Sequence, residues 1–238
     1  MIDAHRDNQL WLYSTGEHPC SYVDGRVART VFVDPAFPIG NAHYSQLIRH
    51  GMRRSGGYIY QPKCPDCTSC KSLRVPVQHF RPNRSQRRCW RRNHDLRIIQ
   101  RPPAFVEDHF RLYRLYMSRR HPGSGMDDHD PDRYMEFLVC PWSDTVFLEI
   151  RHGRELLGVA VSDRVADGLS AVYTFFHPDV PARSIGTFAI LCQIEHARMN
   201  AMEYVYLGYW IAECAKMRYK ADFRPCEVYD GGGWTALP

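Results

Sequence analysis

The chain has 238 residues, which is enough for one large domain or two modest ones, each with its own buried core. Its 44% hydrophobic and 24% charged residues are ordinary for a folded globular protein. The apolar runs are far shorter than the ~20 residues of a membrane helix, and the first residues lack the basic leader and apolar core of a signal peptide. We therefore expect a cytoplasmic protein without a membrane partner.

The net charge of +5 hides an asymmetry between the two halves. Residues 1–120 hold 21 Arg or Lys against 9 Asp or Glu, whereas residues 121–238 hold 10 against 17. Such a split suggests that the first half meets a polyanion. A bias in genome base composition is an alternative source, because most of the basic residues are arginine.

Residues 1–80 are rich in turn formers, with short extended pieces at Arg29–Val33 and Leu73–Val77. This pattern predicts a small, loop-rich domain that a metal would help to stabilise. Helical periodicity begins at Ala104 and predicts a helix that ends before the HPGSG segment at residue 121. His109 and Leu112 lie on one face of this helix.

Three strand-like runs follow, separated by short polar turns, which is typical of an antiparallel meander: Thr145–Arg151, Leu156–Val165 and Leu169–Phe176. A nearly all-apolar helix is predicted at about 184–200, and another strand at Tyr204–Leu207. This is the order of an N-acetyltransferase-like (GNAT) core. We predict an α+β fold with a cysteine-containing basic domain at 1–100 and a GNAT-like mixed-sheet domain at 101–238.

Nine cysteines include three in the segment Cys64-Pro-Asp-Cys67-Thr-Ser-Cys70. Two consecutive CxxC spacings allow thiolates to converge on one soft metal, and Cys20 is the natural fourth ligand. Zinc and an iron–sulfur cluster both fit this pattern. Reduced structural thiols in a turn are the alternative.

The segment Arg81–Arg101 holds eight arginines and a single acid, with a tryptophan in the middle. Arginine forks match phosphate oxygens, and aromatic faces stack on unpaired bases. We predict that this segment binds RNA, which the family resemblance given below identifies as tRNA; a solvated basic face without a partner is the alternative. The predicted contacts are Arg84, Arg87, Arg88, Trp90, Arg91 and Arg92.

Arg183-Ser184-Ile-Gly186 opens the apolar helix, where acetyltransferases place the Q/R-x-x-G-x-G/A motif that holds a cofactor pyrophosphate. Phe188 stands in the sixth position and would crowd a pyrophosphate, which disfavours use of acetyl-CoA. A phosphate of the tRNA end is an alternative occupant beside Arg183 and Ser184, and a plain helix start is equally compatible. Aromatic residues from Tyr206 to Trp210, then Lys216 and Lys220, indicate a substrate-facing surface that includes Tyr209.

Long stretches carry a resemblance to a known family: HPCSYVDGRVARTVFVDP, RRSGGYIYQPKCPDCTSCKSLRVPVQHFRPNRSQRR, GLSAVYTFFHPD, RSIGTFAI and YVYLGYWI…KMRYKADFRP. They resemble the bacterial aspartate/glutamate leucyltransferases, relatives of the eukaryotic arginyl-tRNA–protein transferases, from about Pro19 to Trp234. The resemblance implies transfer of leucine from leucyl-tRNA to proteins that begin with Asp or Glu, which marks them for degradation. The eukaryotic relatives open their cysteine domain with a CxxC pair, whereas only Cys20 is present here.

Aminolysis of an aminoacyl ester requires no cofactor; the enzyme holds the amine against the carbonyl, sheds one proton and stabilises the oxyanion. Glu149 and Tyr173, on neighbouring predicted strands, are the predicted proton-handling side chains. The acidic acceptor residue needs a fixed cation, for which Arg53, Arg54, Lys216 and Lys220 are available. The alternatives are a CoA-dependent N-acetyltransferase and a non-catalytic RNA-binding or metal-sensing protein.

Overall fold

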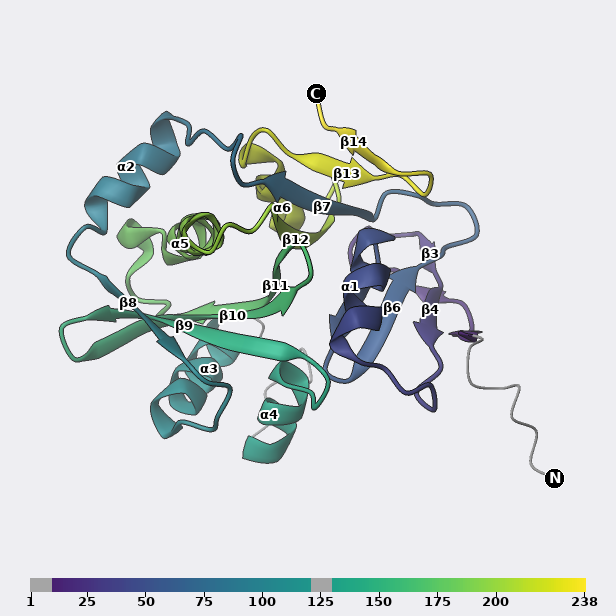
Figure 1. Cartoon of the computed structure of the whole chain (residues 1–238), viewed down its shortest axis with the longest axis horizontal. Helices are drawn as coiled ribbons and strands as arrows, with labels where there is room; N and C mark the ends of the chain where they lie inside the picture. Colours follow the sequence, from purple (N-terminus) through teal and green to yellow (C-terminus); the bar gives the residue numbers. More distant parts are fainter. Residues whose placement is uncertain (1–9, 121–129) are drawn as a thin grey trace.

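The computed structural model describes residues 10–120 and 130–238, and it has an α+β architecture (Figure 1). Its centre is an eight-stranded sheet in the order β14-β13-β7-β12-β11-β10-β9-β8. All neighbouring pairs are antiparallel except β11 and β12, so the sheet is mixed, as the sequence predicts. The strands are β7 (Lys71–Pro76), β8 (Arg97–Arg101), β9 (Asp144–His152), β10 (Glu155–Val165), β11 (Gly168–Phe176), β12 (Tyr204–Trp210), β13 (Glu227–Tyr229) and β14 (Trp234–Ala236).

Helices cover both faces of this sheet (Figure 1). On one face, α5 (Ile185–Met199) packs against β10 and β11 and is covered in turn by α2 (Arg84–Arg92). The opposite face carries α3 (Glu107–Arg120) and α4 (Pro131–Leu138). The predicted meander, buried helix and following strand are therefore confirmed, and a separate apolar core fills each side of the sheet.

A second unit lies at one end of the large sheet (Figure 1). It is a four-stranded sheet of β1 (Leu12–Ser14), β4 (Thr30–Val33), β6 (Tyr58–Pro62) and β5 (Arg53–Ser55), together with α1 (Asn41–Arg49). Two short strands, β2 (His18–Pro19) and β3 (Val27–Ala28), pair beside it. Its core includes Tyr44 and Ile48 of α1, which pack against Val165 and Tyr206 of the large sheet.

Two strands that precede residue 100 belong to the large sheet. β7 pairs with β12 on one side and β13 on the other, and β8 pairs with β9 at the far edge. The predicted domain boundary at residue 100 therefore does not coincide with a boundary of the sheet, and the division of the chain into two domains stays a prediction.

Candidate active site

The two parallel strands at the centre of the sheet separate after a short contact. β11 and β12 pair only through Gly168–Ser170 and Tyr204–Tyr206, although β11 continues to Phe176 and β12 to Trp210. The pairing of β12 with β7 also shifts register between Tyr206 and Gly208. Gly208 has φ +81°, a conformation that residues with a Cβ rarely adopt. Side chains bind part of the backbone where the two strands share no ladder: Arg53 donates to the carbonyl of Ala171, and Lys220 donates to the carbonyl of Tyr209.

Two cations flank this glycine. A Cβ built on Gly208 would lie 3.5 Å from Nε of Arg53 and 3.6 Å from Nζ of Lys220. Arg53 comes from β5 of the small sheet, whereas Lys220 lies in a 3₁₀ helix, η2 (Tyr219–Asp222), which follows α6 (Ala215–Arg218). The fold thus brings together two of the residues that the sequence predicts for substrate binding.

Arg53 is a buried charge with an unused donor. Only 6% of the residue is exposed, and Nη2 donates to the carbonyl of Ala171. Nη1 is buried without a hydrogen-bond partner, and no ion pair to Arg53 forms within residues 10–120 and 130–238. Buried guanidinium groups are normally paired with a carboxylate, because desolvation of an unpaired charge is strongly unfavourable. The free Nη1 is therefore a candidate site for an anionic group of a ligand.

Lys220 is half-buried, and its Nζ donates to the carbonyl of Tyr209 at 2.7 Å. Burial, together with repulsion from Arg53, lowers the pKa of Lys220 to about 7. The ammonium group is therefore partly neutral at neutral pH. An anion placed beside both cations would favour the protonated form.

Tyr209 fixes the end of β12 against the small sheet. Its hydroxyl donates to the carbonyls of Gly51 and Tyr60 at 3.2 and 3.1 Å, and its ring meets that of Tyr60 edge-on at 5.8 Å. These contacts hold Arg53, on the strand next to Tyr60, beside Gly208. Tyr209 is buried and positions Arg53 through these contacts; its role in substrate binding stays a prediction.

The four predicted metal-binding thiols gather near the same end of β12, all of them half-buried. Cys64 and Cys67 form an isolated β-bridge, and Arg26 donates to Sγ of Cys67 at 3.3 Å. Burial, with the nearby thiols of Cys64, Cys20 and Cys67, raises the pKa of Cys70 to about 12.

The thiols are near neighbours, but they do not form a ligand set in this arrangement. Among the described residues, no three His, Cys, Asp or Glu side chains converge closely enough to hold a metal ion. Sγ of Cys67 instead accepts a hydrogen bond from Arg26, which in turn pairs with Glu213. Metal binding therefore stays a prediction, and no chemical step is assigned to a metal.

Arg54 lies next to Arg53 in sequence but points elsewhere, since successive residues of a strand face opposite sides. It forms a two-pronged ion pair with Asp163 of β10 at 2.5 and 2.7 Å, and both side chains are fully buried. A further hydrogen bond reaches the carbonyl of Leu138. The donors of Arg54 are thus occupied within the protein, and the pair joins the small sheet to the large one.

Glu149 and Tyr173, the predicted proton-handling residues, share no hydrogen bond or ring contact with Arg53 and Lys220 among the described residues. Glu149 is buried on β9 and accepts hydrogen bonds from His109 and Arg151, each at 2.7 Å. Burial opposes ionisation of this carboxyl, but these hydrogen bonds outweigh it and lower the pKa of Glu149 to about 2. The hydroxyl of Tyr173 donates to Sδ of Met117 at 3.3 Å, and burial raises its pKa.

The remaining predicted substrate contacts form no hydrogen bond or ion pair with Arg53 or Lys220 among the described residues. Arg183 forms a two-pronged ion pair with Asp95, both contacts 2.9 Å long, and the side chain of Ser184 caps no backbone group of α5. Lys216 is exposed on α6. Their roles stay predictions.

The predicted tRNA-binding segment folds as α2, whose arginines lie on the surface. Asn83 and Gln86 close its first turn through reciprocal hydrogen bonds of 2.9 Å, which is a capping box. Gln86 and Cys89 are buried: Nε2 of Gln86 donates to the carbonyl of Asp222, and the thiol of Cys89 contacts the carbonyl of Ser184, just before α5. The predicted contacts are all exposed: Arg84, Arg87, Arg88, Trp90, Arg91 and Arg92.

Sequence reasoning missed two residues that organise the site. Asp163 forms an ion pair with Arg54. The sequence signal for such a role is the presence of an acidic residue within the apolar run of β10. The positive φ of Gly208 has no sequence signal beyond the glycine itself, which stands inside the predicted aromatic cluster.

Comparison with known proteins gives matches along nearly the whole chain. The family model described as "Arginine-tRNA-protein transferase, N terminus" matches residues 18–88, and the C-terminus model of the same family matches residues 108–230. An aspartate/glutamate leucyltransferase of Alkalilimnicola ehrlichii is 53% identical over 96% of each chain. The aspartate/glutamate leucyltransferase of Nitrosococcus oceani is 47% identical over 94% of this chain and 95% of its own. That of Chromobacterium violaceum is also 47% identical, over 96% of this chain and 95% of its own.

One solved structure, L-PGS from Bacillus licheniformis, matches with a TM-score of 0.46 and 10% identity, over 60% of this chain and 45% of its own. No helix in the described part of the chain is long and apolar enough to cross a bilayer.

Proposed function

Because the chain belongs to the arginine-tRNA-protein transferase family, we propose that it transfers leucine from leucyl-tRNA to the N-terminus of proteins that begin with Asp or Glu. It is an aminoacyltransferase, and its partners are charged tRNA and an acceptor protein. Its proposed location is the cytoplasm, where leucyl-tRNA is present.

The structural observation that supports this proposal is the cation pair at Gly208. Arg53 offers a buried Nη1 without a partner, and Lys220 carries a second positive charge close by. A side-chain carboxylate of the acceptor's first residue would accept hydrogen bonds from Nη1 of Arg53 and from the protonated Nζ of Lys220. Charged hydrogen bonds of this kind are about twice as strong as neutral ones, so the pair would select Asp and Glu over Asn and Gln.

The reaction follows from this placement. With its carboxylate held, the α-amine of the acceptor attacks the ester carbonyl of leucyl-tRNA; a C–N bond forms, the ester C–O bond breaks and the 3′-terminal nucleoside oxygen leaves with a proton. The two substrates would meet where β11 and β12 have separated and share no ladder hydrogen bonds. Glu149 and Tyr173 stay the predicted groups for proton transfer.

The alternative of a CoA-dependent acetyltransferase finds no support at the start of α5. Phe188 is only 3% exposed, and its ring packs against that of Trp90 with centroids 5.5 Å apart. The place of the small sixth residue of the cofactor motif is thus taken by a buried phenyl ring.

The test is a leucine-transfer assay with radiolabelled leucyl-tRNA and two peptides that differ only in a first residue of Glu or Gln. In Arg53→Ala, kcat/KM for the Glu peptide should fall about 30-fold to several-thousand-fold, since losing such a contact typically costs about 2–5 kcal/mol. The Gln peptide should lose far less. Partial unfolding would lower both rates equally, so the Glu/Gln ratio is insensitive to it.

Arg111→Ala is the matched control, because Arg111 is an exposed arginine of α3 paired only with Asp108 among the described residues. It should keep the wild-type ratio. An Arg53→Ala enzyme with an unchanged ratio would place the acceptor carboxylate elsewhere, and absence of leucine transfer by the wild type would overturn the proposed function itself.

A further inference from the structure

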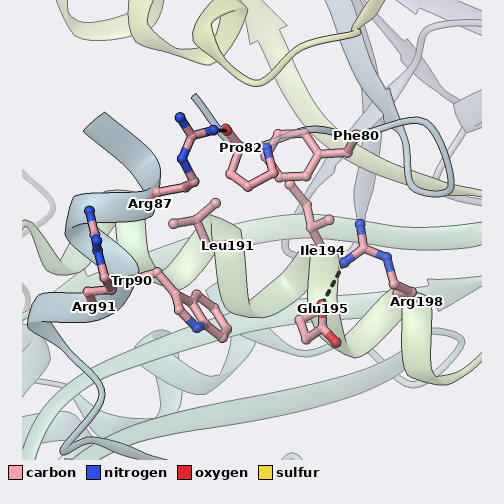
Figure 2. Close-up of a pocket in the computed structure, with 9 residues that line it drawn as sticks. All are labelled: Phe80, Pro82, Arg87, Trp90, Arg91, Leu191, Ile194, Glu195 and Arg198. Atoms are coloured by element: carbon pink, nitrogen blue, oxygen red, sulfur yellow. Dashed lines mark hydrogen bonds and ion pairs between the residues drawn. The ribbon is translucent and has the colours of Figure 1, made fainter. Parts of the chain in front are cut away.

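A cavity of about 540 Å³ lies between α2 and α5, separate from the cation pair at Gly208 (Figure 2). Its walls include Trp90 of α2 and, from α5, Leu191 and Ile194. The volume is in the range of about 300–1,000 Å³ that is common for small-molecule sites. None of the steps of the proposed reaction uses this cavity.

Trp90 gives the cavity a flat apolar wall. Its side chain is unusually accessible for a tryptophan, with 42% of the residue exposed. Contact with the buried ring of Phe188 restrains the indole from one side. Figure 2 shows the indole projecting from α2 toward α5, beside Leu191. A planar group entering the cavity therefore finds an ordered aromatic surface together with aliphatic side chains.

The rim of the cavity is basic. Arg87 and Arg91 of α2 and Arg198 of α5 line it, against one acid, Glu195. Glu195 is paired with Arg198 at 2.7 Å, and Arg87 donates to the carbonyl of Pro82. The guanidinium of Arg91 forms no hydrogen bond or ion pair with any residue that the structure describes, although its backbone carbonyl accepts one from His94. The charges of the rim that are not balanced by an acidic partner are therefore positive, and they lie on α2.

Helix α2 continues this positive charge beyond the cavity. It contains five arginines, of which Arg84, Arg88 and Arg92 lie outside the cavity lining, and it has no acidic residue. A ligand with a planar apolar part and a chain of negative charges matches an aromatic wall next to a row of arginines. A nucleotide within a single-stranded stretch of RNA has this composition.

We propose that the cavity between α2 and α5 holds one unpaired nucleotide of the substrate tRNA, with its base against Trp90 and its phosphates beside Arg87 and Arg91. This inference rests on the proposed function, which supplies tRNA as the nucleic acid. It adds a second point of attachment on the tRNA, distinct from the aminoacyl end at the separated strands.

The experiment measures binding of uncharged tRNA to the full chain over a range of salt concentrations. Trp90→Ala should weaken binding roughly five-fold to 150-fold, the effect of losing a stacked base of about 1–3 kcal/mol, while the dependence on salt keeps its slope. Trp90→Phe should retain most of the affinity. Arg91→Ala should instead reduce the slope of log K against log salt by about 0.9.

Trp11→Ala is the matched control, because Trp11 is 56% exposed and lies outside the cavity. It should bind tRNA like the wild type. Melting curves of each variant separate a loss of binding from a loss of folding.

Leucine-transfer kinetics distinguish the possible failures. In Trp90→Ala, KM for leucyl-tRNA should rise while kcat and the preference for Glu over Gln stay unchanged. If the wild type transfers leucine and Trp90→Ala keeps the wild-type KM for tRNA, the nucleotide site is wrong but the transferase is not. A raised KM for the acceptor peptide alone would assign the cavity to a protein ligand, which overturns the proposal.

Discussion

The preference for acidic acceptors should depend on pH through Lys220. Its pKa lies near 7, instead of the ordinary 10.5, because of burial and then the positive charge of Arg53. A bound carboxylate restores a negative charge beside Nζ and raises this pKa, so substrate binding favours the protonated lysine. Selectivity should therefore be complete below pH 7 and fall as the pH rises through 7.

The size of this effect follows from proton linkage. Above pH 7, the free enzyme must take up a proton to bind the carboxylate, which weakens binding by up to tenfold for each pH unit until the pKa of the bound state is reached. Between pH 6 and pH 9 the Glu/Gln ratio should thus fall by as much as about 100-fold. The acceptor's own amine titrates in the same range, but it does so equally in both peptides and cancels in the ratio.

The assay is kcat/KM for the Glu and Gln peptides at fixed ionic strength from pH 6 to pH 9. Lys220→Arg supplies the comparison, because a guanidinium keeps its charge across this range and should flatten the profile. A wild-type ratio that is constant from pH 6 to pH 9 would refute the reasoning, as would a Lys220→Arg profile with the same midpoint near 7.

The other predictions concern the fold, the metal, the tRNA and the proton. Arg54→Met should destabilise the protein by about 3–5 kcal/mol in denaturant titrations, because it leaves a buried carboxylate unpaired. Anaerobically purified protein is expected to contain a thiolate-bound metal by elemental analysis, and Cys64→Ser should lose it; metal-free protein of full stability and activity would contradict this. Replacing Arg84 and Arg88 together by Ala should flatten the salt dependence of tRNA binding by about two units, and an unchanged slope would leave them as a solvated face. If Glu149 handles the proton, Glu149→Gln should lower kcat about 10²-fold to 10⁴-fold for both peptides, whereas a structural carboxylate would change the melting temperature and leave kcat intact.

The sequence predicted the elements whose hydrophobic period is long and clear. The meander of β9, β10 and β11, the buried α5 and the following β12 all lie where alternation or a sustained apolar run places them. Helix α2 was not predicted as a helix, because an arginine-rich segment shows little apolar periodicity. The only local signal was Asn83 followed three residues later by Gln86, which forms the observed capping box.

The site was predictable only in part, because its residues come from distant segments. The prediction that Arg53 and Lys220 bind the acceptor rests on the need of a carboxylate for a cation. The sequence does not show that these two residues flank one glycine, because they are far apart along the chain. Arg53 and Arg54 are both predicted as cations for the acceptor carboxylate, but they face different partners. Their separation follows from the strand that holds them, which turns one arginine toward Gly208 and the other toward Asp163.

The position of β7 has a consequence for how the chain reaches its native state during synthesis. This strand ends at Pro76, but its two partners in the sheet begin only at Tyr204 and Glu227. At a translation rate of roughly 5–20 residues per second, on the order of ten seconds pass between the synthesis of β7 and the synthesis of its first partner strand. The apolar side chains of Leu73 and Val75, and that of Val77 directly after the strand, remain uncovered during that interval, although they are fully buried in the finished protein. The nascent chain therefore carries an unpaired strand edge that invites chaperone binding or misassociation until its last quarter is made.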